Sequence, residues 1–195
     1  MSHSTLADST ASGPAWLAAS VLIALIGTIG SVFLSVGLGL KACPLCFYQR
    51  SFVMAALAVL LLGWFAGRSR PGFVSLLSVP LAWAGLGVAA FHQYLVLTNV
   101  LECPQGLLSL GTAPAQSLAL FVALAITTTI GACACRGGST EQGTGTLIGA
   151  IVLGVILAGA CVKSSPPLPP APTAAYDAVK QPLETCRRPF VAPKS

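Results

Sequence analysis

Residues 15–40 read AWLAASVLIALIGTIGSVFLSVGLGL and carry no charged side chain. A helix needs about 20 predominantly apolar residues to cross the hydrocarbon core of a bilayer. This run is too long for the apolar core of a signal peptide. No basic flank precedes it, and no A-x-A-like cleavage site directly follows it. We therefore expect a transmembrane helix that the protein retains.

Four further apolar runs follow, at residues 47–66, 73–98, 115–134 and 146–162. Each is long enough to span a bilayer, and the last lies at the short end of the range. The expected fold is all-α. An integral membrane four-helix bundle occupies residues 15–135, and a fifth transmembrane helix occupies residues 146–162.

Two other segments flank the bundle. Residues 1–14 form an N-terminal tail. Residues 163–195 are rich in Pro and Ala, which favours an extended tail with some polyproline II structure. Gly145 and Gly149 form a small-xxx-small pair, which we expect to seat the fifth helix against a neighbouring helix.

The composition indicates a protein that is solvated mainly by lipid. Hydrophobic residues make up 55% of the chain and charged residues 8%, and the mean hydropathy is +0.84. Soluble domains carry about 25% charged residues. The formal net charge is +5, but the ten basic residues are dispersed and form no stripe, which argues against nucleic-acid binding. Membrane lipid is therefore an expected partner.

The basic residues of the linkers predict the orientation of the helices. Arg68 and Arg70 follow the second helix and Arg136 follows the fourth, whereas the 99–114 linker has no Lys or Arg. The positive-inside rule places the linkers that carry arginine in the cytoplasm. The N-terminal tail is then cytoplasmic, and the C-terminal tail lies outside.

The seven cysteines divide between the two sides of the membrane. Those expected outside are Cys43, Cys46, Cys103 and Cys186, and Cys161 lies near the outer end of the fifth helix. Disulfides persist in an oxidising outer compartment. Cys133 and Cys135 fall on the cytoplasmic side, where we expect inert small hydrophobes, with a C-x-C metal site as the alternative.

Residues 41–50 read KACPLCFYQR and contain a C-x-x-C pair, whose sulfurs can close a small disulfide ring reversibly. Lys41, Arg50 and the positive end of the following helix favour a thiolate, which is the form that attacks a disulfide. A structural disulfide or half of a zinc site is the alternative. No second C-x-x-C or His pair has a zinc-ligand spacing, so no metal is expected.

The sequence CPLCFYQR after a first transmembrane helix resembles the disulfide bond formation protein B (DsbB) family, and the resemblance covers roughly residues 15–135. It implies a multi-pass enzyme of the bacterial inner membrane with its active cysteines on the periplasmic side. Such an enzyme reoxidises a periplasmic, DsbA-like oxidase of the thioredoxin fold. It passes the electrons to a quinone, either ubiquinone or menaquinone, and so supports protein disulfide bond formation.

The resemblance also implies roles for three residues of this stretch. Cys43 and Cys46 are the pair next to the quinone, and Cys46 is the thiolate that forms a charge-transfer complex with it. Arg50 stabilises that charged state. An arginine at the centre of a spanning helix costs at least about 2.5 kcal/mol on insertion scales, which by itself favours a functional role. Snorkelling of the Arg50 side chain to the lipid headgroups is the alternative.

A quinone site needs a flat apolar slot and hydrogen-bond donors aimed at the carbonyl oxygens of the ring. We expect Phe47, Tyr48, Arg50 and His92 to provide these features. The resemblance assigns a histidine near the end of the third helix to the quinone, and His92 matches that position. The alternative for His92 is a hydrogen bond to a carbonyl group of a neighbouring helix.

Cys103, in LECPQG, resembles the family cysteine that forms a mixed disulfide with the partner oxidase. Family members usually carry a second cysteine in the same outer loop, and this loop has none. We expect Cys186, in LETCRRPF, to pair with Cys103, with Arg187 and Arg188 favouring its thiolate. Cys161 is the second candidate for that pairing.

Three other classes of function compete with this interpretation. A vitamin K epoxide reductase-like enzyme also has a C-x-x-C at a four-helix bundle, but there the motif lies late in the chain. A non-enzymatic membrane protein would bind a metal through Cys43 and Cys46. A membrane scaffold would use its cysteines only as a disulfide staple that never cycles.

Overall fold

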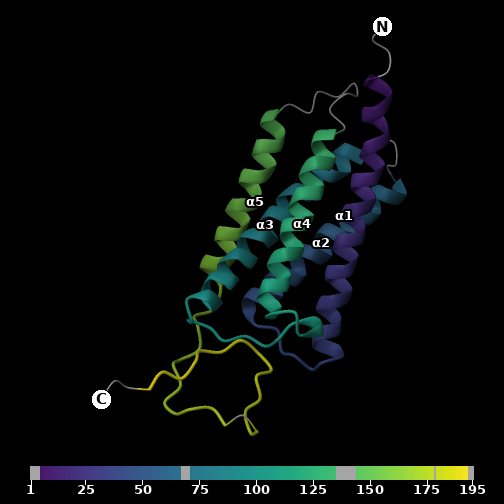
Figure 1. Ribbon diagram of the computed structural model, residues 1–195. Coiled ribbons are helices and arrows are strands. Elements are labelled where there is room, and N and C mark those ends of the chain that lie inside the picture. The colour runs from purple at the N-terminus through teal and green to yellow at the C-terminus, as the bar shows by residue number, and fades with distance from the viewer. Residues whose placement is uncertain (1–4, 67–70, 135–143, 178, 193–195) are drawn as a thin grey trace.

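The computed structural model describes residues 5–66, 71–134, 144–177 and 179–192. Its five α-helices lie side by side in one elongated bundle (Figure 1), and each is long and apolar enough to cross a membrane. Their bounds are α1 Thr5–Val36, α2 Pro44–Ala66, α3 Pro71–Leu97, α4 Ala113–Ala134 and α5 Thr144–Ser164, with a short 3-10 helix, η1, at Leu107–Ser109. The predicted all-α membrane bundle with a fifth spanning helix is confirmed.

Helix α3 lies at the centre of the bundle. It packs against α2, α4 and α5, while α1 packs mainly against α2 and α4. The closest approach of α3 to α4 depends on a glycine, because a Cβ atom at Gly85 would overlap the ring of the buried Phe121. Small residues at helix crossings let backbones approach in a bilayer, where packing contacts hold the helices together.

Helix α5 packs against α3 through small residues in its second half. A Cβ atom at Gly154 would lie 2.7 Å from the carbonyl oxygen of Pro80. One turn further on, the Cβ atom of Ala158 faces Gly87, and a Cβ atom added to that glycine would lie 2.6 Å from it. This pair of contacts seats the fifth helix.

The prediction that Gly145 and Gly149 seat α5 is wrong. Among the residues that the structure describes, no atom beyond the local helix lies within 4 Å of a Cβ atom built at either glycine. The same part of α5 contacts the bundle through Leu147 and Ile151, which pack against a buried cluster that includes Val79 of α3. The two glycines therefore lie on the face of the helix that points away from its neighbours.

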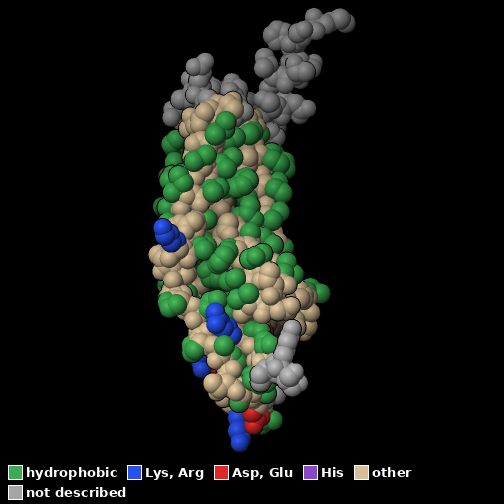
Figure 2. Space-filling model, turned by 90° about the vertical axis from the view of Figure 1, so that its left-hand side faces the viewer, with side chains coloured by type: hydrophobic (Ala, Val, Ile, Leu, Met, Phe, Trp, Pro, Cys, Tyr) green, Lys and Arg blue, Asp and Glu red, His purple; other side chains and the backbone are tan. Residues whose placement is uncertain are grey.

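Large apolar side chains cover the outside of the helices. Exposed examples are Ile26 and Phe33 on α1, Leu62 and Phe65 on α2, Leu77 on α3, Ile126 on α4, and Val155 and Ile156 on α5. Hydrophobic side chains follow the length of the face shown in Figure 2, and the charged side chains visible there lie from about its middle to its lower end. Exposed apolar surface of this extent indicates contact with lipid, so the chain is a multi-pass membrane protein.

One end of the bundle, here called the cysteine end, comprises residues 37–46, 98–112 and 165–192. Helices α1 and α3 end there, α2 and α4 begin there, and the tail after α5 crosses it (Figure 1). The chain turns after α1 through Gly39, whose φ of +67° is a left-handed conformation that glycine adopts without strain. The tail that follows Ser164 contains no helix in its described part, as its composition predicts.

We expect Gly85→Ala to destabilise the contact of α3 with α4, because the new methyl group would meet the Phe121 ring. Overpacking of a core costs about 1–3 kcal/mol. Thermal unfolding in detergent micelles should therefore show a lower midpoint than that of the unchanged protein. Gly149→Ala is the matched control, since its methyl group meets no neighbour and alanine is the better helix former. Equal midpoints for the two variants would contradict this packing.

Candidate functional site

The C-x-x-C motif forms the N-terminus of α2. Pro44 is the first residue of the helix, a position that suits proline because the N–H it lacks would have no partner there. Cys43 caps the helix. Its carbonyl accepts the N–H of Phe47 at 2.9 Å, and its Sγ accepts the N–H of Cys46 at 3.2 Å. The sulfur atoms of Cys43 and Cys46 lie 2.7 Å apart, so the two cysteines of the motif face each other.

A disulfide bond joins Cys103 to Cys186, 83 residues later in the chain. Cys103 is buried, and Cys186 is partly buried on the tail. The predicted pairing of these two cysteines is confirmed, and Cys161, the second candidate, is a free thiol on α5. The C-terminal tail thus supplies the second cysteine that the 99–114 linker lacks.

Pairing between Glu102 and Arg187 holds the tail beside this linker. The N–H of each residue donates to the carbonyl of the other, at 2.9 and 3.0 Å, in an isolated antiparallel bridge. Arg187 Nε also donates to Glu102 Oε1 at 2.6 Å, and its guanidinium lies 3.7 Å from the centre of the Tyr176 ring. Lys41 and Glu184 form a second anchor, with an N–H to carbonyl bond of 2.8 Å and an ion pair of 3.0 Å. These contacts align the tail with the bundle.

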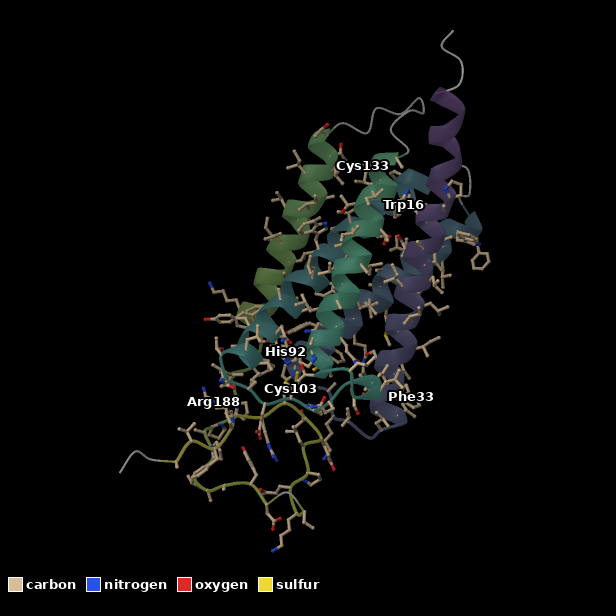
Figure 3. The ribbon with its side chains drawn as sticks, in the orientation of Figure 1. Trp16, Phe33, His92, Cys103, Cys133 and Arg188 are labelled. Carbon is tan, nitrogen blue, oxygen red and sulfur yellow. A yellow bond between two sulfur atoms is a disulfide. The ribbon has the colours of Figure 1, made fainter. Side chains whose placement is uncertain are left out.

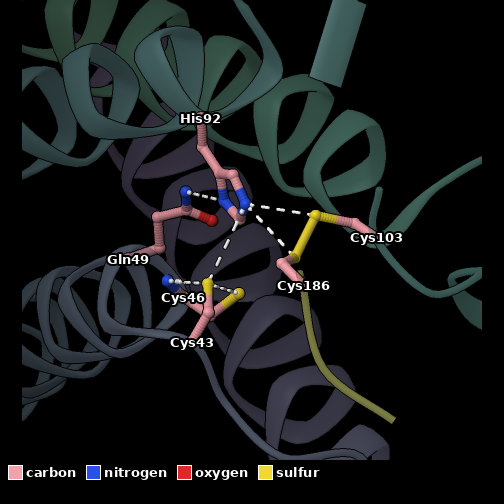
Figure 4. The surroundings of a disulfide bond; sticks show 6 residues. All are labelled: Cys43, Cys46, Gln49, His92, Cys103 and Cys186. Carbon is pink, nitrogen blue, oxygen red and sulfur yellow. Dashed lines mark hydrogen bonds between the residues drawn. A yellow bond between two sulfur atoms is a disulfide. The ribbon is translucent and has the colours of Figure 1, made fainter. Parts of the chain in front are cut away.

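His92 lies between the two cysteine pairs. It comes from the C-terminal part of α3 and is fully buried. Its Nε2 lies 3.8 Å from the Sγ of Cys43, 3.5 Å from that of Cys103 and 3.4 Å from that of Cys186 (Figure 3, Figure 4). One nitrogen atom therefore contacts one sulfur of the first pair and both sulfurs of the second.

Two neutral side chains hold the other side of the imidazole. His92 Nδ1 lies 3.2 Å from Nε2 of Gln49, and the hydroxyl of Ser117 donates to Oε1 of Gln49 at 2.6 Å. The partners of His92 are thus side chains, not the helix carbonyl of the alternative interpretation. Sequence reasoning missed Gln49 and Ser117. A glutamine three residues after Cys46, inside an apolar helix, was the available signal.

The pKa of Cys43 lies well below the ordinary thiol value. The largest cause is the hydrogen bond that the Cys46 thiol donates to its sulfur. Burial opposes the shift, and the contact with His92 adds to it. The position also suits a thiolate, because the N-terminus of a helix favours negative charge. The assignment of Cys46 as the thiolate opposite a quinone stays a prediction.

A cavity of about 270 Å³ lies beside Cys46 and is lined by residues of α1, α2 and α4 and of the cysteine end. Most of the lining side chains are apolar, among them Leu34, Val53 and Leu120. Cys186 also borders the cavity, so each cysteine pair presents one sulfur-bearing residue to the same space.

Arg50 is fixed on the wall of this cavity by α1. Its Nε donates to Ser31 Oγ at 2.8 Å, and its Nη2 donates to the carbonyl of Ser31 at 3.0 Å and to Ser35 Oγ at 2.5 Å. Its Nη1 makes no hydrogen bond with any residue that the structure describes. The side chain is thus held by contacts with α1 while it lines the cavity.

The other predicted quinone-binding residues do not line this cavity. Phe47 is 61% exposed on the outside of α2. Tyr48 packs against the cluster that contains Cys43 and Leu45. His92 faces the sulfur atoms. The structure therefore brings Arg50 and Cys46 together at the cavity, and it separates Phe47, Tyr48 and His92 from it.

The same cluster has the donor atoms of a metal site. The ligand atoms of Cys43, Cys46, His92 and Cys186 all lie within 4.8 Å of one another. Because Cys186 is in a disulfide, two thiols and one imidazole remain, whereas structural zinc uses four ligands. This redox state therefore disfavours a structural zinc.

One of the two cysteines expected in the cytoplasm, Cys133, lies apart from this cluster. Cys133 is a free, partly buried thiol near the other end of the bundle (Figure 3). Cys135 lies outside the residues that the structure describes. The inert character of both stays a prediction.

Comparison with protein families identifies one match. The family model of disulfide bond formation protein DsbB matches residues 13–158. The matched segment includes Cys43, Cys46, His92 and Cys103, and it ends before Cys186. No curated protein and no solved structure matches the chain.

We expect the Cys43 thiolate to titrate below the ordinary thiol value of 9.0 when Cys43 and Cys46 are reduced. Because its pKa is lowered, the thiolate persists to a lower pH than an ordinary thiolate and is lost only as the pH falls through that lowered pKa. The ultraviolet absorbance of the thiolate, taken as the difference between the protein and Cys43→Ser, measures this midpoint. Cys46→Ala should raise it, since the largest cause of the shift is removed. A midpoint near 9.0 in the unchanged protein would contradict the assignment.

Arg187→Ala should weaken the docking of the tail and so disfavour the Cys103–Cys186 disulfide. The ion pair with Glu102 is partly exposed, so we expect its loss to lower the equilibrium constant for disulfide formation by up to about fivefold. Equilibration against a glutathione redox buffer, with mass spectrometry of both cysteines, measures this constant. Lys180→Ala is the matched control, because that tail cation is exposed and makes only a 4.0 Å pair with Asp177. Equal equilibrium constants for the two variants would contradict the role of Arg187 in docking the tail.

Proposed function

Because the chain belongs to the DsbB family of disulfide bond formation proteins, which are membrane oxidoreductases, we propose that it is a thiol:quinone oxidoreductase. It reoxidises a periplasmic, DsbA-like oxidase of the thioredoxin fold and transfers the electrons to ubiquinone or menaquinone. The observation that carries this proposal is the contact of two cysteine pairs at one buried histidine, His92.

Electrons enter at the Cys103–Cys186 disulfide. A thiolate of the reduced partner attacks one of its sulfurs and forms a mixed disulfide. The second thiol of the partner then attacks the partner's own sulfur in that mixed disulfide and releases the cysteine of this chain. The partner leaves oxidised, and Cys103 and Cys186 are left as thiols. One of them attacks Cys43 in the Cys43–Cys46 disulfide, and the other completes the exchange. The Cys103–Cys186 bond is restored, and the two electrons now reside on Cys43 and Cys46.

The cavity beside Cys46 fits a quinone headgroup. A quinone, when bound, supplies a two-electron acceptor for the dithiol. The cavity volume of about 270 Å³ is close to the lower end of ligand pockets, roughly 300–1,000 Å³. Its apolar lining suits the ring, and the Nη1 donors of Arg50 suit a carbonyl oxygen. Cys46 lines the same cavity, which is where the last thiol of the electron path must be.

The redox poise of the partner accounts for the use of a quinone. DsbA-like oxidants have potentials of about −120 mV, and glutathione would reduce such a protein instead of regenerating it. The bacterial periplasm is kept oxidising kinetically through quinone. In the proposed orientation the cysteine end faces the periplasm of a bacterial inner membrane, which agrees with the arginines in the opposite linkers.

The first test is quinone reduction by the purified protein, driven by a reduced partner of the thioredoxin fold. We expect reduction by the unchanged protein and by Cys133→Ser, whose thiol is distant from the site. Cys186→Ser should lose at least about a hundredfold in rate, because Cys103 then has no intramolecular partner for the second exchange. No reduction by the unchanged protein would overturn the proposal in favour of a metal-binding protein or a disulfide-stapled scaffold. Full activity of Cys186→Ser would remove the tail from the electron path.

A further inference from the structure

His92 has no task in the electron path described above, although it touches three of the four active sulfurs. Burial of a polar ring is costly unless its nitrogens find partners. Its Nδ1 has the amide of Gln49, and its Nε2 has only sulfur atoms. A buried imidazole in that position either donates to sulfur or accepts from it, and its tautomer decides which.

The orientation of the Gln49 amide in the structure selects one tautomer of His92. The Ser117 hydroxyl donates to the Oε1 of Gln49, so the amide presents its NH₂ group to the imidazole. An NH₂ group only donates. The Nδ1 atom of His92 must then accept, and the hydrogen of the neutral ring lies on Nε2. The Nε2–H group points at the sulfurs of Cys43, Cys103 and Cys186.

This N–H group has no competitor at the second cysteine pair. Within the described part of the chain, it is the one hydrogen-bond donor that contacts the sulfurs of Cys103 and Cys186. The nearest charged groups, Glu102 and Arg187, are engaged with each other. Cys43 has a second and a third donor, the thiol and the backbone N–H of Cys46.

We propose that His92 is a fixed Nε2–H donor that stabilises the thiolate charge as it passes from the Cys103–Cys186 pair to Cys43. This role rests on the proposed function and differs from the contact with a quinone that the family resemblance implies. It makes His92 a catalytic residue of disulfide exchange between the two cysteine pairs.

The step balances without a proton leaving the imidazole. A thiolate of the reduced second pair attacks Cys43 Sγ, a new S–S bond forms, and the Cys43–Cys46 bond breaks with its electron pair on Cys46. The remaining thiol of the second pair gives its proton to the Cys46 thiolate and attacks its partner sulfur, and Cys43 leaves with the electron pair. Negative charge therefore begins and ends on sulfurs that lie within 3.8 Å of the same N–H group. A donor that is already in place at both positions lowers the barrier without moving.

The tautomer can be observed directly. The chain has two histidines, so protein labelled with ¹⁵N-histidine gives two imidazole spin systems, and His3→Ala assigns them. We expect His92 to show a protonated Nε2 and an unprotonated Nδ1. The opposite pattern, with hydrogen on Nδ1, would mean that the Gln49 amide is reversed and would overturn the proposal. Ser117→Ala should allow the second pattern to appear, because it frees the amide to turn.

The rate of exchange between the pairs tests the catalytic role. Protein with both disulfides formed is mixed with the reduced partner, quenched with acid, alkylated, and analysed by mass spectrometry for the state of each pair. We expect His92→Phe to slow the reduction of Cys43–Cys46 by about 10- to 100-fold, as the loss of a hydrogen bond to a charged group predicts. His92→Gln, which keeps an N–H donor, should recover part of that rate. Tyr94→Phe, an exposed change on the same helix, is the matched control.

Two readouts separate this role from others. If His92 is a donor to sulfur, its loss lowers kcat, leaves the KM for quinone unchanged and raises the pKa of Cys43. Unchanged exchange in His92→Phe together with a raised KM would overturn the proposal and assign His92 to the quinone. If the unchanged protein exchanges between its pairs but reduces no quinone, the proposed function fails while the role of His92 stands.

Discussion

The pairing of Glu102 with Arg187 is the contact on which the cysteine end depends. It joins a linker between two helices to the C-terminal tail, and it does so one residue away from each cysteine of the Cys103–Cys186 disulfide. In the proposed electron path the disulfide must open whenever electrons pass through it. During that interval the backbone bridge and the ion pair would keep the sulfur of Cys186 near Cys103 and His92. A covalent bond alone would not serve a path that breaks this bond in each cycle.

The bilayer explains why so much of the fold was predictable from the sequence. A spanning helix has a required length and an apolar exterior, so the apolar runs predicted all five helices. The pairing of Cys186 was predicted from the family resemblance, because family members carry two cysteines in the linker where this chain has only Cys103, and Cys161 was the other candidate. The C-x-x-C motif and Arg50 carried their own signals, since a C-x-x-C pair is typical of reversible disulfide chemistry and a charge inside a spanning helix is rare.

The contacts between helices were not predictable, because the length of an apolar run does not fix the rotation of a helix about its axis. The small residues Gly145 and Gly149 have the right spacing to seat α5, yet Gly154 does so, since α5 turns that face toward Pro80. The contacts of His92 could not be predicted for the same reason. His92 bonds to Gln49, and Gln49 bonds to Ser117, so the two bonds join three helices, and only the relative rotation of these helices brings the side chains into reach.

The tail that brings Cys186 to Cys103 is also a tether. When the disulfide opens, Cys186 becomes a tethered reactant whose effective concentration at Cys103 is set by the segment that follows α5. Short flexible tethers give effective concentrations in the millimolar range, and stiff or badly matched ones give less. The proline-rich stretch at residues 166–172 stiffens this segment. The rate of ring closure can therefore change through the length and proline content of the tail, while every side chain around the sulfurs stays the same.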